Sequence, residues 1–425
     1  MLCEFKARLN GSRQDDSILV NVKRNAVSIS VNTCTVYTFD LLGRLVTAVR
    51  NGHTYRRSLD NRMMEKWSIS GRGQRRRVRT WLDQEAIERL VNQIHGQMMG
   101  LSHCIEQRAV VVEAGEEFEN AHAGMVRALH KIIRHDYRKL AEDAGVFRSI
   151  YRPIGILPPD LYMTLVLQAT AGCSYNRCDY CDFYKNQPFS AKSPDEFITH
   201  IRQVKEYFGT SLALRKSVFL GEANAFDLPI GKLLPLVDAV NAQFHFSPGD
   251  GRAGGTGQTF DGIYSFLSGF GRPKTESDFA ELRARHVRRV YAGLESGSGE
   301  VLRLLNKPAR VDNVVEMANR CRRAGIGAGV IILLGAGGRH LYSQHVDETV
   351  KAIRAMNLTK DDILYFSPLI PRAGSKYAQR LASREVEALS ENEMELQKAD
   401  MLAGFQLSPA SRPKVALYDI NEFIY

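Results

Sequence analysis

Three cysteines stand within nine residues of one another, in the segment Cys173-Ser-Tyr-Asn-Arg-Cys178-Asp-Tyr-Cys181. They follow an apolar run at residues 162–168 that predicts a β-strand. A closed structural zinc site needs four ligands, and no fourth partner stands nearby in the sequence. An iron–sulfur cluster that is held by only three thiolates keeps one iron open, and an open iron can bind a small molecule. The spacing therefore indicates a metal centre that can do chemistry.

The other cysteines and the composition narrow the setting of this centre. Cys3, Cys34, Cys104 and Cys321 are scattered, and seven cysteines in 425 residues do not make a disulfide framework. Apolar residues make up 44% and charged residues 24% of the chain, which is typical of a globular protein. No apolar run approaches the ~20 residues of a membrane helix, and the N-terminus lacks the apolar core of a secretory signal. We therefore expect a cytoplasmic protein with no membrane partner.

From residue 160 onward, strand and helix patterns alternate, and these elements must position the cysteines. Strands are predicted at residues 162–168, 217–220, 262–267, 289–294, 327–334 and 361–366. Helices are predicted between them at residues 194–208, 229–242, 275–285, 311–324 and 345–356. Six such units in series favour an α/β fold, a partial (β/α)6 TIM-like parallel barrel. Active sites of such sheets lie at the carboxyl ends of the strands, and the cysteines follow the first strand directly.

The rest of the chain predicts smaller units around this barrel. Residues 1–80 carry short alternating β patterns, with Asn51-Gly52 as a hairpin turn, and they predict an antiparallel meander. Helices are predicted from about residue 83 and at residues 117–144. We therefore expect a small α+β N-terminal region before the barrel. The predicted divisions are a β-rich basic domain (1–80), a helical segment with a Pro-rich linker (81–155), the core barrel (156–370), and a C-terminal helix, expected at residues 384–400, with a docked tail (371–425).

Three segments on successive strands together resemble the radical S-adenosylmethionine (SAM) superfamily. They are the cysteine triplet, Gly221-Glu222 after the second strand, and Gly293-Leu-Glu-Ser-Gly297 at the fourth strand. The resemblance spans roughly residues 160–370. It implies that Cys173, Cys178 and Cys181 ligate three irons of a [4Fe–4S] cluster, and that SAM binds the fourth. It also implies an enzyme in which one electron from the reduced cluster cleaves SAM to a 5′-deoxyadenosyl radical, which then abstracts hydrogen from a substrate.

The resemblance implies cofactor-binding roles at two further places. Gly221 and Glu222 correspond to the glycine–glutamate pair that receives the SAM ammonium, with Leu220 in place of a first glycine. A carboxylate suits that amine, and glycine allows the backbone to come close. Tyr180, immediately before the third cysteine, stands where the family places an aromatic ring against the adenine; packing within the loop is the alternative.

Strands four and five supply the remaining cofactor contacts that the resemblance implies. Glu295 and Ser296 correspond to contacts with the ribose and the methionine end of SAM, and a helix cap is the alternative for Ser296. Ile331 and Leu333 would form the apolar wall against the adenine. The family's pattern on this strand is only partly visible.

One departure from the family concerns the cysteine spacing. The first gap holds four residues, whereas the family usually has three. An extra residue in a loop can still wrap the same cluster, so we expect all three cysteines to ligate it. A zinc site is the alternative, and it would borrow a fourth ligand such as His200 or Asp182.

The type of reaction is less sharply defined by the sequence. Neither a cobalamin-binding signature nor a second cysteine cluster is present, which favours a single-cluster enzyme that abstracts one hydrogen. We expect epimerisation or oxidation of a small sugar-like or peptide metabolite. Cys321 is a candidate catalytic thiol, because a thiol can return a hydrogen atom to a substrate radical; packing on a buried helix face is the alternative. The resemblance also implies a reducing partner such as flavodoxin or ferredoxin.

A basic stretch near the N-terminus suggests other partners. The formal net charge is +10, and residues 56–79 carry nine basic and two acidic residues. These include Arg75, Arg76, Arg77 and Arg79, which could dock RNA for a radical SAM enzyme that modifies it. A solvated basic loop is the simpler alternative. A non-catalytic zinc or nucleic-acid-binding protein is a third possibility. Separately, the glycine-rich residues 249–257 predict a loop near the barrel mouth, a candidate lid.

Overall fold

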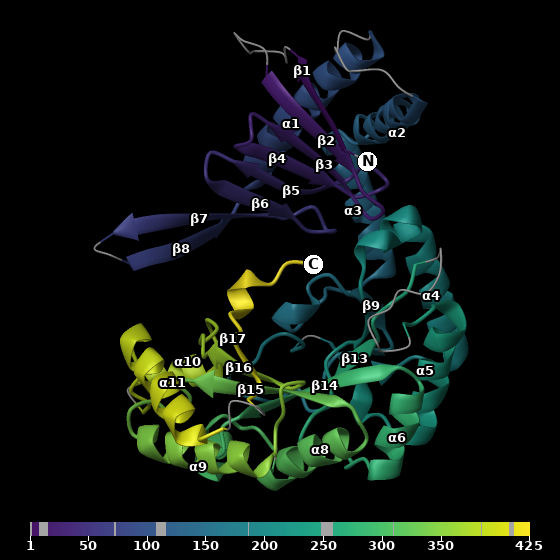
Figure 1. The fold of residues 1–425 in the computed structure, drawn as a ribbon. Coiled ribbons are helices and arrows are strands. Elements are labelled where there is room, and N and C mark those ends of the chain that lie inside the picture. The colour runs from purple at the N-terminus through teal and green to yellow at the C-terminus, as the bar shows by residue number, and fades with distance from the viewer. Residues whose placement is uncertain are drawn as a thin grey trace. The chain divides into compact units, whose positions relative to one another are not determined.

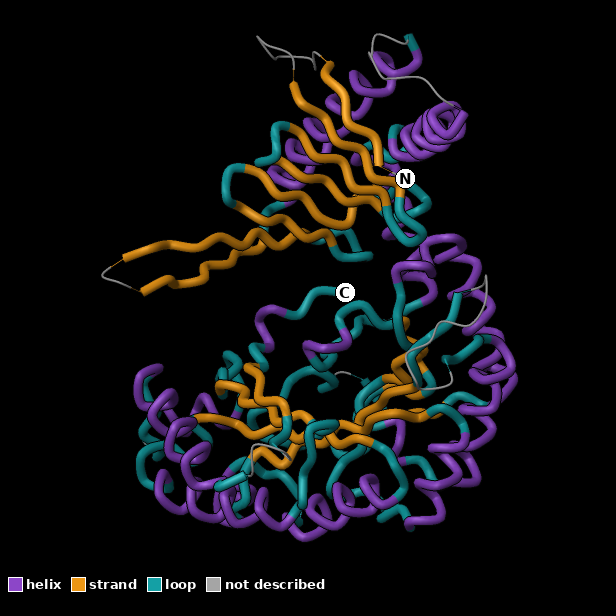
Figure 2. The backbone as a smooth tube through the Cα atoms, viewed as in Figure 1, coloured by secondary structure: helices purple, strands orange, loops and turns teal. Residues whose placement is uncertain are grey.

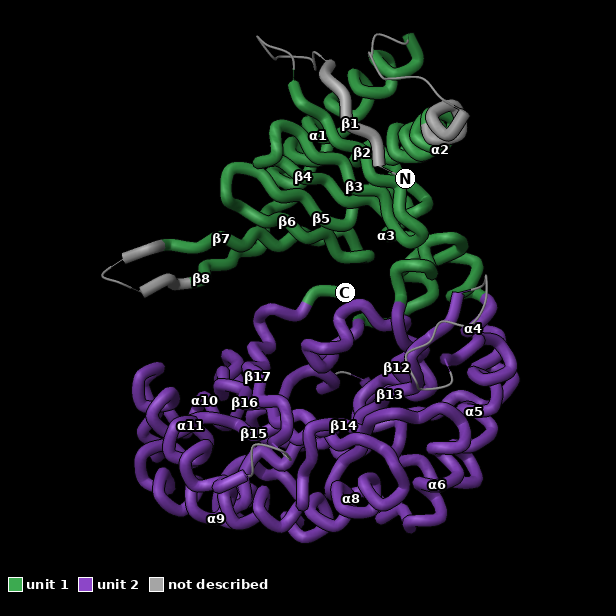
Figure 3. Tube along the Cα trace, viewed as in Figure 1, with its two compact units in different colours: residues 1–153, 203–215, 424–425 green, residues 154–202, 216–423 purple. Residues whose placement is uncertain are grey.

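The structure is a computed structural model that describes residues 2–7, 16–71, 74–107, 116–185, 187–247, 258–308, 310–383, 385–407 and 412–425. The chain divides into two compact units, which Figure 3 shows in different colours. Unit 1 comprises residues 1–153, 203–215 and 424–425. Unit 2 comprises residues 154–202 and 216–423. The glycine-rich residues 249–257 and residues 72–73 lie outside the described ranges.

The sheet of unit 1 is an antiparallel meander in which each strand pairs with the next (Figure 1). Its strands are β1 (Leu2–Ala7), β2 (Asp16–Val22), β3 (Val27–Val31), β4 (Thr35–Phe39), β5 (Leu45–Arg50), β6 (His53–Arg57), β7 (Met63–Gly71) and β8 (Gln74–Trp81). Between β5 and β6, Asn51 and Gly52 both have positive φ, at 50° and 78°. Tight hairpin turns need this geometry, and Asn-Gly adopts it readily. The predicted meander and its turn are confirmed.

Three helices accompany this sheet, namely α1 (Gln84–Glu106), α2 (Glu116–Ile132) and α3 (Tyr137–Ile150). Their buried apolar side chains share one core with those of the strands. The prediction of one helix at residues 117–144 is wrong, because the chain turns between α2 and α3. The Asp136 carboxylate accepts the backbone N–H of Lys139 at 2.8 Å and so caps a new helix.

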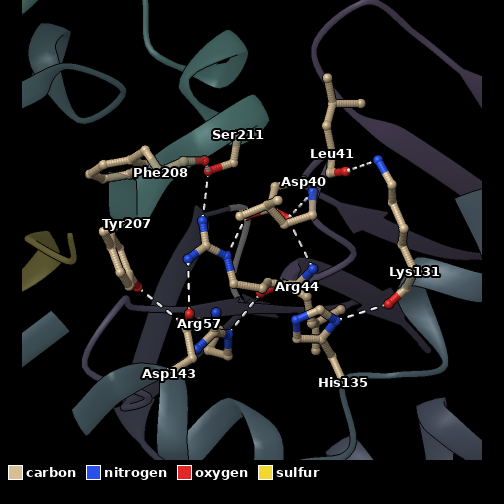
Figure 4. A network of polar contacts seen from close by, with 12 residues as sticks. Asp40, Leu41, Arg44, Arg57, Lys131, His135, Asp143, Tyr207, Phe208 and Ser211 are labelled. Carbon is tan, nitrogen blue, oxygen red and sulfur yellow. Dashed lines mark hydrogen bonds and ion pairs between the residues drawn. The ribbon is translucent and has the colours of Figure 1, made fainter. Parts of the chain in front are cut away.

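A buried arginine lies at the centre of a polar network within unit 1 (Figure 4). The side chain of Arg44 is 1% exposed and forms ion pairs with Asp40 at 2.7 Å and Asp143 at 3.0 Å. Its Nη2 donates to Ser211 Oγ at 2.6 Å, and the Tyr207 hydroxyl donates to Asp143 at 2.9 Å. Burial alone would lower the pKa of Arg44, but neighbouring Asp40, Tyr207 and Asp143 outweigh it and raise that pKa. The guanidinium is therefore a permanently charged, fully engaged group.

Unit 2 contains a parallel sheet of seven strands in the order β17-β16-β15-β14-β13-β12-β9. They are β9 (Leu165–Gln168), β12 (Val218–Gly221), β13 (Ile263–Phe266), β14 (Val287–Glu295), β15 (Gly327–Leu334), β16 (Ile363–Pro368) and β17 (Lys414–Leu417). The α/β class and the TIM-like parallel sheet are confirmed. The sheet has one more strand than the six expected, because the supposed docked tail supplies β17, which pairs in parallel with β16.

Helices line the outer face of the curved sheet (Figures 1 and 2), and further helices follow its strands along the chain. They are α4 (Pro194–Phe208), α5 (Ile230–Gln243), α6 (Glu276–Ala284), α7 (Gly299–Leu304), α8 (Val311–Arg323), α9 (Tyr342–Ala355), α10 (Lys376–Ala382) and α11 (Glu391–Phe405). The acidic helix expected at residues 384–400 begins later, because Ser390 and Glu393 form a capping box at the start of α11. A short ribbon of β10 (Thr170–Ala171) and β11 (Ser190–Ala191) flanks the cysteine loop.

The chain also forms short 3₁₀ turns, namely η1 (Pro159–Leu161), η2 (Gly209–Leu214), η3 (Ala225–Asp227) and η4 (Ile420–Glu422). No helix in the described ranges is long and apolar enough to cross a lipid bilayer.

Candidate functional site

The three clustered cysteines line one cavity of about 190 Å³ in unit 2. They lie on the loop that follows β9 and β10. Residues at or just beyond the ends of the neighbouring strands line the same cavity, among them Asn224, Ser268, Glu295 and Ser367. The carboxyl ends of parallel strands meet at one edge of a sheet, so side chains far apart in sequence are gathered here.

The longer first gap between the cysteines is taken up by a left-handed turn. Asn176 has φ 52°, a conformation that asparagine tolerates better than most residues. Its side-chain amide donates to the carbonyl of Tyr184 at 2.6 Å. Lys185 Nζ in turn donates to the carbonyls of Asn176 at 3.1 Å and Cys178 at 2.9 Å. These contacts give the four-residue gap a defined path around the cavity.

Burial keeps two of the thiols protonated in the absence of a metal. It raises the pKa of Cys178 to about 12, although the ammonium of Lys307 opposes the shift. It raises the pKa of Cys181 to about 11, against an opposing hydrogen bond from the Phe183 backbone. A bound metal reverses this preference, because its positive charge stabilises the thiolate.

The donor atoms in the cavity suit an iron–sulfur cluster better than a zinc ion. Three soft sulfur donors on one cavity fit an iron–sulfur cluster in kind. Among the described residues, no group of three or more His, Cys, Asp or Glu side chains is placed to hold a metal ion by itself. Of the two candidate zinc ligands, His200 does not line the cavity; its Nε2 accepts the N–H of Gln168 at 3.0 Å, and burial lowers its pKa to about 3. Asp182 lines the cavity and pairs with Arg372 at 3.5 Å.

Glu295 forms the polar wall opposite the cysteines. Its carboxylate accepts from Lys307 Nζ and Tyr180 Oη, at 2.5 and 3.0 Å, and all three side chains line the cavity. The side chain folds back over Gly293, where any Cβ would overlap the Glu295 carboxylate. A shift in strand register between these two residues and a φ of 60° at Glu295 produce this bend. Glycine at position 293 is therefore required by the shape of the site.

Glu222 lies beside the cavity and not on its wall. Its carboxylate accepts from the Gln168 side chain at 2.5 Å, and its backbone carbonyl accepts the Thr170 hydroxyl at 2.9 Å. Gly221 ends β12, and the next two residues, Ala223 and Asn224, line the cavity. The side chain of Glu222 is buried, with 3% of the residue exposed.

The other predicted residues divide between the cavity and the packing behind it. Ile331 and Leu333 of β15 line the cavity. Ser296 does not: its hydroxyl lies 2.7 Å from His345 Nδ1 and accepts the N–H of Ser298 at 2.9 Å. Cys321 is fully buried on α8 and does not line the cavity, which supports its alternative role as a packing residue.

His345, which contacts Ser296, is a neutral imidazole ring. Its Nε2 lies 2.9 Å from the carbonyl of Leu333, so Nε2 carries the hydrogen. Nδ1 is then an acceptor, and the Ser296 hydroxyl donates to it. Burial lowers the pKa of His345 to about 4. Ser296 and His345 therefore connect the end of β14 to β15 outside the cavity.

The structure adds further cavity residues to those that the sequence predicted. Lys307, Asn224 and Arg372 were not predicted, because each lies on a loop between elements and has no partner nearby in sequence. Lys307 was the one that could have been found, since it follows the helix after β14 and Glu295 needs a cation. Arg372 Cζ lies 5.7 Å from the ring centre of Phe183, over the same cavity.

Residues 167–353 match the family model for the radical SAM superfamily. A search of curated proteins found no match. Among solved structures, coproporphyrinogen III oxidase (HemN) from Escherichia coli is 15% identical, with a TM-score of 0.39, covering 64% of this chain and 55% of that one. TsrM from Kitasatospora setae, described as a radical SAM methyltransferase with tryptophan and a SAM analogue bound, is 14% identical, with a TM-score of 0.40, covering 64% and 58%.

A third similar structure is Elp3 from Methanocaldococcus infernus, which is 10% identical, with a TM-score of 0.36, covering 60% of this chain and 56% of that one. This chain thus spans little more than half the length of each of these three solved proteins. The matched segment runs from the end of β9 to α9 and includes all three clustered cysteines. Residues 167–353 of this chain are therefore similar to the radical SAM superfamily, the family that the cysteine segment resembles.

Proposed function

We propose that the chain is an enzyme that cleaves SAM reductively at a [4Fe–4S] cluster held by Cys173, Cys178 and Cys181. The observation that carries the proposal is that all three thiols line one cavity in the domain that matches the superfamily. When bound, the cluster and SAM supply a 5′-deoxyadenosyl radical able to abstract hydrogen. The residues of the chain bind, orient and shield these groups. Flavodoxin or ferredoxin is the class of reductant that we propose.

The walls of the cavity support distinct roles in holding SAM. Tyr180 is fixed by its hydrogen bond to Glu295 and offers a ring against the adenine. Ile331 and Leu333 add an apolar wall. Glu295, whose charge Lys307 balances, is a hydrogen-bond acceptor suited to ribose hydroxyls. We keep Gly221, Glu222 and Ser296 as proposed SAM-site residues, which would act next to the cavity.

The remaining cavity lining supports a small substrate. Much of it is apolar, including Phe266, Leu267, Phe270, Leu369 and Ile370. Apolar walls exclude water and protect a radical from side reactions. Arg372 and Asp182 are the charged groups on the loops near this part of the cavity. We propose that a small sugar-like or peptide metabolite loses one hydrogen there and is then epimerised or oxidised.

The test is anaerobic reconstitution with iron and sulfide, reduction with dithionite, and measurement of 5′-deoxyadenosine after SAM is added. We expect product from the wild type and none from Cys178→Ala. Cys34→Ala is the matched control, because Cys34 is an exposed thiol of unit 1. Stoichiometric zinc in a colourless protein that takes up no iron would overturn the proposal in favour of a non-catalytic zinc protein.

RNA is a second candidate substrate, and one observation favours it. Strand pairing places Lys66 opposite Arg79 and Ser68 opposite Arg77, so these cations and Arg56, opposite Met64, share one face of strands β6–β8. A row of cations on one face of a sheet attracts a polyanion such as RNA. Trp67 stacks on His53, 5.4 Å between ring centres, on the opposite face, so this surface suits phosphates rather than stacked bases.

The RNA candidate predicts a salt-dependent complex with unmodified bulk tRNA. Replacing Arg77 and Arg79 by glutamine should reduce the salt slope of binding by about one per cation removed, and leave SAM cleavage intact. Unchanged tRNA affinity in this variant would exclude the basic face as the docking surface. The side chains of Arg75 and Arg76 lie outside the described residues and are left unchanged in this test.

A further inference from the structure

The cysteine loop is held by polar side chains that are not themselves candidate ligands. Asp179 stands between the second and third cysteines, and its side chain is 4% exposed. Its carboxylate pairs with Arg380 Nη2 at 3.2 Å and accepts from Asn306 Nδ2 at 3.3 Å. Its backbone N–H donates to the carbonyl of Leu305 at 3.0 Å, and its own carbonyl accepts the N–H of Tyr377 at 3.2 Å. A buried carboxylate is costly unless it is compensated in this way.

Asn306 reaches the loop at two more points. Its Nδ2 donates to the carbonyl of Arg177 at 2.8 Å, and its Oδ1 accepts the Tyr175 hydroxyl at 3.0 Å. The Asn306 side chain thus contacts the loop on both sides of Cys178. Tyr175 and Arg177 precede this cysteine, and Asp179 follows it. Asn306 itself has φ 48°. This left-handed turn follows α7 and leads directly to Lys307, which pairs with Glu295.

These contacts matter because the loop has no regular secondary structure of its own. No helix turn or sheet ladder spans residues 172–181, so side-chain contacts must fix its backbone. Groups that orient metal ligands without binding the metal commonly change metal affinity about 10–100-fold when they are removed.

We propose that Asn306 and Asp179 are positioning residues that hold the cysteine loop in the conformation that accepts a metal cluster. Arg380 of α10 contacts Asp179 and the carbonyl of Leu304, and we call Asn306, Asp179 and Arg380 together the brace. The proposal rests on the proposed function, and it goes further because it assigns the loop's geometry to residues that neither bind metal nor line the cavity. The brace also links the loop to Glu295 through the adjacent Lys307.

The variant Asn306→Asp tests the brace in the full chain. It keeps the size of the side chain but replaces a donor with a second carboxylate beside Asp179. We expect the reconstituted cluster to be lost to an iron chelator about tenfold faster than in the wild type, with a changed EPR spectrum in the reduced state. The double variant Asn306→Asp, Asp179→Asn restores a donor–acceptor pair and should recover much of the retention.

A second readout needs no cluster. In the metal-free chain, alkylation of Cys178 and Cys181 by iodoacetamide should be several-fold faster in Asn306→Asp than in the wild type, because the loop is released. Asp362→Asn is the matched control: Asp362 is also buried, and it accepts the N–H of Ala328 at 2.6 Å and of Thr359 at 2.7 Å on unrelated elements. This control should lower thermal stability without changing cluster loss or alkylation.

Three results would overturn the inference. One is wild-type cluster retention and alkylation in Asn306→Asp. Another is an equal effect in Asp362→Asn, and the third is no rescue by the double variant. A wild-type chain that takes up no iron would instead count against the proposed function, and the alkylation rates would still decide whether the brace exists.

Discussion

The two units bury polar groups in opposite ways. In unit 1, the guanidinium of Arg44 contacts two carboxylates and a hydroxyl (Figure 4). In unit 2, Cys178 and Cys181 face a cavity, and burial raises the pKa of both thiols. The first arrangement is complete without any added group. For the second, we propose that a positively charged cluster completes the site by converting the thiols to thiolates.

We propose that this difference separates a structural site from a functional one. A compensated buried charge contributes to a specific fold, and removing one partner is expensive. A cavity lined by neutral thiols has given up packing contacts, which costs stability unless a ligand replaces them. Both regions are buried and polar, so burial alone does not identify a functional site. The distinguishing feature that we propose is a set of metal-binding side chains that lines a cavity.

The largest effect should come from breaking the complete network. Arg44→Met leaves the buried Asp40 and the half-buried Asp143 without this cation, and the free energy of unfolding of unit 1 should fall by about 3–5 kcal/mol. Tryptophan fluorescence reports this unit selectively, because the chain's two tryptophans, Trp67 and Trp81, both lie in it. Iron taken up per folded chain should not change. A variant with normal stability and lost iron would break the comparison.

A smaller effect should appear as pH dependence in unit 2. Burial holds the pKa of His345 at about 4, so the unfolded chain binds a proton below pH 6.5 that the folded chain refuses. Stability should therefore fall as pH falls from 6.5 towards 4, by about 2 kcal/mol at pH 5. His200, with a pKa of about 3 for the same reason, adds to the slope.

The variant His345→Gln should flatten this pH slope without abolishing it. Labelling of the fully buried Cys321 by dithiodipyridine during urea unfolding at pH 7 and pH 5 measures unit 2, because this reagent still reacts with thiols at acid pH. An equal slope in the variant and the wild type would show that the histidine is protonated in the folded chain.

The left-handed turn at Asn176 should have a moderate effect. Asn176→Gly and Asn176→Ala both lose the amide contact with Tyr184, but only alanine is strained at φ 52°. The alanine variant should therefore be less stable than the glycine variant by about 1 kcal/mol, and it should retain its cluster less well. Equal cluster retention in the two variants would show that the loop path does not depend on this conformation.

The smallest expected effect concerns the break between α2 and α3. Asp136→Ala removes the cap of α3 and should lower the stability of unit 1 by about 1 kcal/mol, whereas Asp136→Asn should lower it by much less. Thermal unfolding followed by tryptophan fluorescence measures both. Neither variant should alter cluster loading, since the cavity belongs to unit 2; a loading defect would show that the two buried regions are coupled.

The sequence by itself determined what depends on local pattern and chemical type. Strand and helix periodicity predicted the parallel sheet and the meander, and the cysteine spacing predicted a metal centre on one loop. Local errors arose where a single side chain decided an element boundary, as Asp136 did between α2 and α3 and Ser390 did at α11. The strand at residues 414–417 was missed because it is short and most of its evidence is its pairing with β16.

Only the tertiary structure decided which residues meet. Lys307 joins Glu295, Asn306 reaches Tyr175 and Asp179 across more than 120 residues, and Arg44 finds Ser211 across 167. Cys321 and Ser296 carry suitable functional groups, yet the fold turns them away from the cavity. Residue type is written in the sequence, but proximity depends on how the sheet aligns the ends of its strands. Chemistry that needs two distant groups together is therefore decided by the fold.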